Sequence, residues 1–143
     1  MVAIFTGGDV LLETHIFEKA FPQERPRINR HTRSIYSPVE KQGPVRRQLD
    51  LYDSEPIAES FFLTAHFFYK DLKDFKKNDV DNLIKALADS LQAVGVITND
   101  NLMVGCHGTK NMCGEDWIWL ELRKAKQLSI SLEAISRTVF SAS

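Results

Sequence analysis

Apolar residues recur at helical spacing between residues 80 and 91, and this is the clearest pattern along the chain. Asp79 or Asn78 is a suitable N-cap for a helix that begins here, and Gly95 is a suitable stop soon after it. The apolar face would hold the helix against a core, while a neighbouring face presents carboxylates, an amide and a lysine. The apolar positions are Val80, Leu83, Ile84, Leu87 and Leu91.

Aromatic-rich and alternating runs predict a sheet around this helix. Residues 59–70 are apolar on both faces, which is typical of a central strand, and His66 within it is interpreted as a packed core residue rather than a ligand. Residues 116–123 alternate, and another strand begins at residues 102–104. Turn formers fill residues 105–114 between them, so the two strands are predicted to form a hairpin.

The rest of the chain gives weaker signals. Short strands are predicted at residues 2–5 and 14–21, joined by a turn at Gly7-Gly8. Residues 70–78 are predicted to be a charged loop, and the tail from 128 to 140 shows loose helical periodicity.

Length and composition indicate one soluble globular domain spanning residues 1–143, because 43% of the residues are hydrophobic and 26% are charged. The net charge of −1 excludes a globally basic nucleic-acid binder. We expect a cytoplasmic protein with no membrane partner, since no apolar run could span a bilayer and the start lacks a secretory signal. Cys106 and Cys113 are expected to be reduced thiols, and together with His107 they lack the fourth ligand of a zinc site.

Residues 19–47 are basic and rich in proline, with eight Lys or Arg against two acids. This segment is interpreted either as an arm that contacts DNA phosphates or as a solvated loop. Lys76 and Lys77 then lead the chain into the acidic stretch. The candidate DNA-binding residues are Arg25, Arg27, Arg30, Arg33, Lys76 and Lys77.

Acidic residues gather around the start of the predicted helix. Asp79 and Asp81 are one residue apart, Lys85 follows one turn later, and Asp100 lies in a polar turn before the next apolar run. A common alternative is an ion-pair ladder of Asp81, Lys85 and Asp89 on a solvated face, with Asp79 favoured by the helix dipole.

The combination resembles the RusA-like family of Holliday-junction resolvases. The family signature is a Lys/Arg-x-Asp-x-Asp-Asn-x-x-Lys run, followed one helix and turn later by an Asp-Asp pair. Here the run reads Lys77-Asn78-Asp79-Val80-Asp81-Asn82-Leu83-Ile84-Lys85, and the second element reads Asn99-Asp100, with Asn99 in place of the first acid. Arg25-Pro26-Arg27 and Tyr36-Ser37-Pro38 look like the family's basic N-terminal segment, and the resemblance covers residues 15–123.

This resemblance implies a compact, homodimeric, mixed α/β (α+β) domain with a mixed sheet and a central acidic helix, acting on four-way DNA. It further implies that Asp79, Asp81 and Asp100 hold Mg²⁺, with Mn²⁺ as a possible substitute, and that Lys85 orients the phosphate. Because residues two apart on an ideal helix diverge by about 200°, Asp79 is expected on the incoming loop and Asp81 in the first turn. A nuclease for flaps or other branched DNA, and a non-catalytic junction-binding protein, remain as alternatives.

Overall fold

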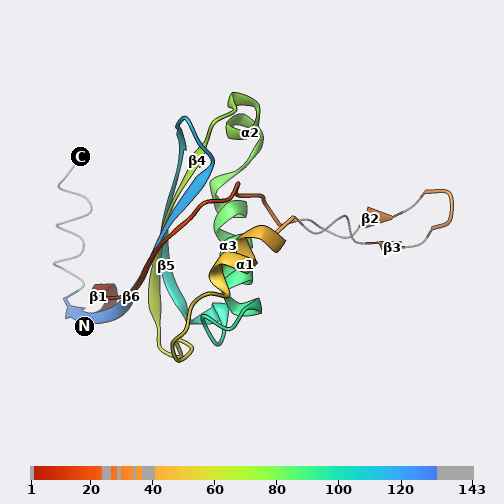
Figure 1. The fold of residues 1–143 in the computed structure, drawn as a ribbon. Helices are drawn as coiled ribbons and strands as arrows, with labels where there is room; N and C mark the ends of the chain where they lie inside the picture. The colour runs from red at the N-terminus through yellow and green to blue at the C-terminus, as the bar shows by residue number, and fades with distance from the viewer. Residues whose placement is uncertain (1, 24–26, 29, 34, 37–40, 132–143) are drawn as a thin grey trace.

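The computed structural model describes residues 2–23, 27–28, 30–33, 35–36 and 41–131, which form a mixed α/β arrangement. A four-stranded sheet has the order β1-β6-β4-β5, and β2 and β3 form a separate ribbon (Figure 1). Within these ranges no helix is long and apolar enough to cross a membrane. In chain order the elements are β1 (Val2–Ile16), β2 (Arg27–Ile28), β3 (Ile35–Tyr36), α1 (Gly43–Leu49), β4 (Phe61–Tyr69), α2 (Leu72–Lys77), α3 (Val80–Ala93), the 3₁₀ turn η1 (Asp100–Leu102), β5 (Met103–Met112) and β6 (Trp117–Ile130).

The core lies between one face of the sheet and the helices α1 and α3 (Figure 1). Along β4 every second residue from Phe61 to Tyr69 is buried, and the residues between them are half-buried. The helices complete the core with residues such as Leu49 of α1 and Leu83 and Leu91 of α3, which are almost fully buried. The predicted central strand and the predicted acidic-motif helix are therefore both confirmed.

The histidine in the central strand is packed, but it is not in the core. His66 is half-buried on the sheet face away from the helices, and its ring stacks on Trp119 with centroids 5.2 Å apart. Its Nδ1 lies 2.6 Å from the hydroxyl of Thr109 on β5. The period of a strand places alternate residues on opposite faces, so this position follows from the register of β4.

The predicted hairpin between β5 and β6 is wrong, because β4 lies between these strands. β5 pairs in parallel with β4, while β6 pairs antiparallel with both β4 and β1. Parallel neighbours need a long crossover connection, and α2 and α3 provide it here. The chain from β4 through α3 to β5 therefore carries the whole acidic stretch across one face of the sheet.

Close packing of α3 on β5 explains why the glycine-containing segment is strand and not turn. A Cβ at Gly108 would stand 2.6 Å from Cδ1 of Ile84 and 2.8 Å from Cγ1 of Val80. A Cβ at Gly105 would stand 2.3 Å from the ring of Phe62. Glycine within a strand often marks such a close approach, so these residues do not terminate β5.

The predicted turn at Gly7-Gly8 is also wrong, because β1 runs unbroken from Val2 to Ile16. Its pairing with β6 changes register between Gly7 and Val10 and again before Leu12. A Cβ at Gly8 would lie 3.0 Å from the carbonyl oxygen of Lys124. The two glycines thus accompany a β-bulge, which bends the strand instead of reversing it.

Residues 70–78 are not all loop, since Leu72–Lys77 form the short helix α2. Tertiary contacts stabilise this charged segment: the Lys110 ammonium donates to the carbonyl of Phe75 at 2.7 Å and lies 4.7 Å from that residue's ring centroid. The Pro-rich basic segment likewise contains the helix α1, which the composition did not predict. Of the predicted helical tail, residues 128–130 belong to β6 and residues 132–140 lie outside the described ranges.

Candidate active site

A pocket of about 280 Å³ brings together three of the four predicted catalytic residues. Asp81 and Lys85 reach it from successive turns of α3, and Asp100 reaches it from η1. Their side chains belong to exposed residues, so the pocket opens to solvent. The rest of the lining is apolar apart from a thiol, and consists of Ile84, Ala88, Met103 and Cys106.

Asp79, the fourth predicted catalytic residue, precedes Asp81 by two residues in the sequence but does not line the pocket. It is the N-cap residue of α3 with extended backbone angles, while Asp81 is in the first helical turn. This confirms the expected split between incoming loop and helix. The Asp79 side chain makes no capping hydrogen bond, and the amide of Asn82 lies 3.5 Å from its Oδ2, so its carboxylate is available for other contacts.

The return of the chain after α3 brings Asp100 to the pocket. Gly95 has φ +81°, and the N–H of Val96 donates to the carbonyl of Leu91 at 2.9 Å. This is the Schellman arrangement that reverses a chain after a helix, and it confirms the predicted stop. An isolated parallel bridge between Ile57 and Ile97 then fixes the outgoing segment.

Two side chains hold Asp100 in place after that reversal. Gln92, in the last turn of α3, accepts a hydrogen bond from the N–H of Asp100 at 2.8 Å. Asn99 caps η1 by accepting from the N–H of Asn101 at 2.9 Å. Aspartate and asparagine cap helices equally well. Asn99, which stands where the family signature has an aspartate, can therefore keep the same capping geometry and differs from it by the loss of one negative charge.

A buried network holds the other end of α3. Asn78 is 2% exposed, and its Nδ2 donates to the carbonyl of Asp74 at 2.9 Å and to the hydroxyl of Tyr69 at 3.3 Å. Tyr69 donates in turn to the carbonyl of Ala20 at 2.8 Å. Burial raises the pKa of the Tyr69 phenol, so this donor keeps its proton.

An ion pair borders this network. The Lys19 ammonium donates to Asp74 at 2.8 Å and lies 3.9 Å from Asp116. The hydrogen bond from Lys19 lowers the pKa of Asp74, and the same bond raises the pKa of Lys19. The network therefore joins the segment after β1 to α2 and to the start of α3.

The ion-pair ladder considered as an alternative does not form within the described ranges. Asp89 pairs with Arg46 of α1 at 3.1 Å, a bond between helices. None of the ion pairs found in those ranges involves Asp81, Lys85 or Asp100. The pocket carboxylates are thus left for a ligand instead of being neutralised by a neighbouring cation.

The donor set suits a hard divalent cation, because carboxylate oxygens are what Mg²⁺ prefers. Asp81 and Asp100 share the pocket, and Asp79 is the N-cap residue of the helix that carries Asp81. In the part of the chain that the structure describes, however, no three Asp, Glu, His or Cys residues are already grouped closely enough to hold a metal ion. Cys106 and Cys113 are both free and exposed.

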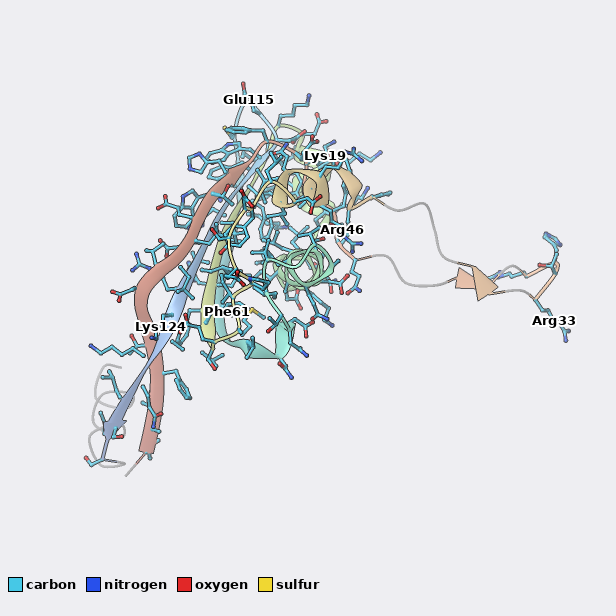
Figure 2. The ribbon with its side chains drawn as sticks, turned by 60° about the horizontal axis from the view of Figure 1, so that its bottom comes forward. Lys19, Arg33, Arg46, Phe61, Glu115 and Lys124 are labelled. Atoms are coloured by element: carbon cyan, nitrogen blue, oxygen red, sulfur yellow. The ribbon has the colours of Figure 1, made fainter. Side chains whose placement is uncertain are left out.

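The predicted DNA-binding residues fall into two groups. Lys76 and Lys77 are exposed in the last turn of α2, just before Asp79. Arg30 and Arg33 are exposed on the β2–β3 connection, and Figure 2 shows Arg33 far from Lys19 and Arg46 on the body of the molecule. The backbone of Arg27 belongs to β2, and Arg25 lies outside the described ranges.

Sequence reasoning missed Gln92, Tyr69 and Asn78 as supports of the site. Gln92 lies on the polar side of a well-predicted helix, where nothing in the pattern distinguishes it from a solvated residue. The sequence indicates Asn78 only as a possible cap, and Tyr69 only as part of an aromatic strand. Asn78 meets Tyr69, the last residue of β4, only in the folded chain. The residues next to Asn78 in the sequence therefore do not indicate its hydrogen bond.

Comparison with known proteins places the same region in one family. The family described as Endodeoxyribonuclease RusA matches residues 19–118, which include all of the pocket residues. A curated relative, the Crossover junction endodeoxyribonuclease RusA of Aquifex aeolicus (strain VF5), is 36% identical over 53 residues. The match covers 36% of this chain and 42% of the relative, so it spans less than half the length of each.

Proposed function

The chain belongs to the RusA endodeoxyribonuclease family, and from that premise we propose that it is a metal-dependent nuclease that resolves four-way DNA junctions. One observation carries this proposal: Asp81, Lys85 and Asp100 line a single open pocket, although Asp100 is nineteen residues from Asp81. Two carboxylates and a lysine beside them are the groups that phosphodiester hydrolysis with a bound cation requires.

In this proposal Asp79, Asp81 and Asp100 hold Mg²⁺, for which Mn²⁺ can substitute. The cation would supply activation of water and stabilisation of charge on the leaving oxygen. Asp81 and Asp100 would provide oxygen ligands within the pocket, and Asp79 would add a third from the incoming loop. Lys85 lies one turn from Asp81 and binds a non-bridging phosphate oxygen, which favours the more highly charged transition state.

Basic side chains outside the pocket would hold the DNA backbone. Lys76 and Lys77 lie immediately before the acidic stretch, and exposed Arg30 and Arg33 lie on the projecting ribbon. With Arg25 and Arg27 they would contact phosphates over a wide area, which fits recognition of branched DNA by shape more than by base sequence. A four-way junction has approximate two-fold symmetry, so we propose that the protein acts as a homodimer. We also propose that it acts on DNA in the cytoplasm.

The test compares labelled four-way, flap and linear duplex DNA, incubated with the protein in Mg²⁺ or in chelator. The proposal predicts paired, symmetric nicks in the four-way substrate, and only with Mg²⁺. Equal cleavage of the flap would indicate a nuclease for branched DNA in general. Tight junction binding without cleavage, even with Mn²⁺, would contradict the proposal and indicate a non-catalytic binding protein.

A further inference from the structure

The residue that precedes the N-cap of α3, Asn78, is a buried polar side chain whose hydrogen-bonding capacity is only partly satisfied. The side chain of Asn78 is almost completely buried, and a buried amide destabilises a protein unless its polar atoms are hydrogen-bonded. Its nitrogen has two partners, but its Oδ1 is buried and accepts no hydrogen bond within the described ranges. An apolar residue of similar size would avoid this cost, which points to a role for Asn78 other than stability.

The partners of Asn78 explain what it fixes. Its bond to the carbonyl of Asp74 closes the end of α2, and its bond to Tyr69 ties the same residue to the end of the central strand. Tyr69 is completely buried and is anchored a second time through the carbonyl of Ala20. Asn78 is thus held by one strand, one helix and the segment after β1.

Asp79 follows Asn78 directly, and its carboxylate has little support of its own. Its residue is exposed, its side chain does not cap α3, and only the 3.5 Å contact from Asn82 reaches its carboxylate. Its backbone carbonyl accepts a hydrogen bond from the N–H of Leu83 at 3.0 Å, so α3 fixes the backbone of Asp79 on the helix side. On the incoming side, the backbone of Asp79 is fixed through Asn78. A ligand that must converge with Asp81 and Asp100 needs a fixed starting point, and groups behind the ligands of a metal commonly provide it.

We propose that Tyr69 and Asn78 are positioning residues that set Asp79 for binding of the divalent cation. This inference rests on the proposed function, because it assumes that the acidic pocket binds a metal ion. The hydroxyl of Tyr69 acts through the Asn78 amide and does not touch the metal, the DNA or the reacting phosphate. Loss of this hydrogen bond leaves Asp79 in place on average but lets its backbone sample positions from which the carboxylate cannot converge.

The test is Tyr69→Phe, which removes one hydroxyl and keeps the buried ring. Calorimetric titration with Mn²⁺ and with Mg²⁺, without DNA, measures metal affinity directly. We expect the affinity to fall about tenfold or more, as for other residues that support metal ligands. Junction binding in chelator is expected to be unchanged. Tyr52→Phe is the matched control, because its hydroxyl donates to the carbonyl of Glu55 in an exposed turn, and it is expected to bind metal like the parent protein.

A double-mutant cycle separates positioning from a general loss of stability. Asn78→Ala alone and combined with Tyr69→Phe should weaken metal binding by nearly the same factor, because the hydroxyl of Tyr69 acts on Asp79 only through the Asn78 amide. All titrations are made well below the unfolding temperature of each variant. If Tyr69→Phe does not fold, Asn78→Ala is compared with the parent protein in the same titration.

Failure of the inference and failure of the proposed function give different results. A parent protein that binds metal and cleaves junctions, with Tyr69→Phe and Asn78→Ala binding metal equally well, would overturn the positioning role alone. A parent protein that neither binds the cations nor cleaves junctions would overturn both.

Discussion

The two ends of α3 each lead to an aspartate of the candidate site, Asp79 before the helix and Asp100 after it, but they are held by different kinds of interaction. At the C-terminal end the backbone itself reverses the chain, through Gly95 and the Ile57–Ile97 bridge. The side chains of Gln92 and Asn99 hold Asp100 only after that reversal. The N-terminal end is held by side chains, since the buried pair of Asn78 and Tyr69 leads to Asp79.

This difference has a consequence for how each end responds to substitution. A backbone reversal depends on one residue's conformational freedom, so its loss shifts the whole following segment. A side-chain network distributes the constraint over several strands and helices, so it fails in small steps. The two ends should therefore be distinguishable by matched variants, from the most damaging to the least.

Gly108→Ala should have the largest effect on stability, because it presses on the N-terminal half of α3. The added methyl would meet Ile84 and Val80 at distances well inside van der Waals contact. We expect a loss of about 1–3 kcal/mol in the free energy of unfolding, measured by urea denaturation. Gly114→Ala is the control, since its Cβ would meet nothing within 4 Å, and it should change stability by less than about 0.5 kcal/mol. Equal effects of the two substitutions would contradict the tight contact between α3 and β5.

Gly95→Ala tests the backbone reversal itself. A Cβ at Gly95 has open space around it, so any loss of stability comes from φ +81° and not from a clash. The expected cost is about 1 kcal/mol, again measured by urea denaturation. Gly114→Ala serves as control here also, because that glycine has equal space without a left-handed φ. An unchanged free energy of unfolding would mean that the chain reverses after α3 without the left-handed residue.

Asp74→Asn tests the ion pair that borders the side-chain network, and its effect should depend on pH. The hydrogen bond from Lys19 lowers the pKa of Asp74 below its ordinary value of 3.8, so the carboxylate stabilises the fold above that pH. The contribution is lost as pH falls through the lowered pKa of the folded state. We expect a loss of at most about 1 kcal/mol at pH 7, because the pair is partly solvated.

The corresponding measurement is urea denaturation of the parent protein and Asp74→Asn at pH 7 and at pH 2. The difference should be present at pH 7 and shrink toward zero at pH 2. The raised pKa of Lys19 adds an upper limit, since its contribution holds below pH 10.5 and is lost as pH rises through the raised value. A difference that stays constant with pH would show that the charge of Asp74 contributes nothing.

The same comparison explains what the sequence could predict. Glycine after an apolar helical run and asparagine in a polar turn act on their own neighbours, so the end of α3 and the approach to Asp100 were predictable. Tyr69 and Asn78 are close in sequence, but their role depends on Ala20 and Lys19, which arrive only with the folded chain. The failure at residues 105–114 has a related cause, since Gly105 and Gly108 respond to side chains from β4 and α3 that local pattern does not reveal.

We propose that DNA is cleaved at the pocket lined by Asp81, Lys85 and Asp100. The decisive experiment measures cleavage of a labelled four-way junction in Mg²⁺ by Asp81→Asn and by Asp89→Asn. Both substitutions replace a carboxylate of α3 with an isosteric amide, but Asp89 pairs with Arg46 outside the pocket. We predict that Asp81→Asn lowers the cleavage rate by at least about a hundredfold while still binding the junction, and that Asp89→Asn cleaves at the parent rate. Cleavage by Asp81→Asn at the parent rate would contradict the claim.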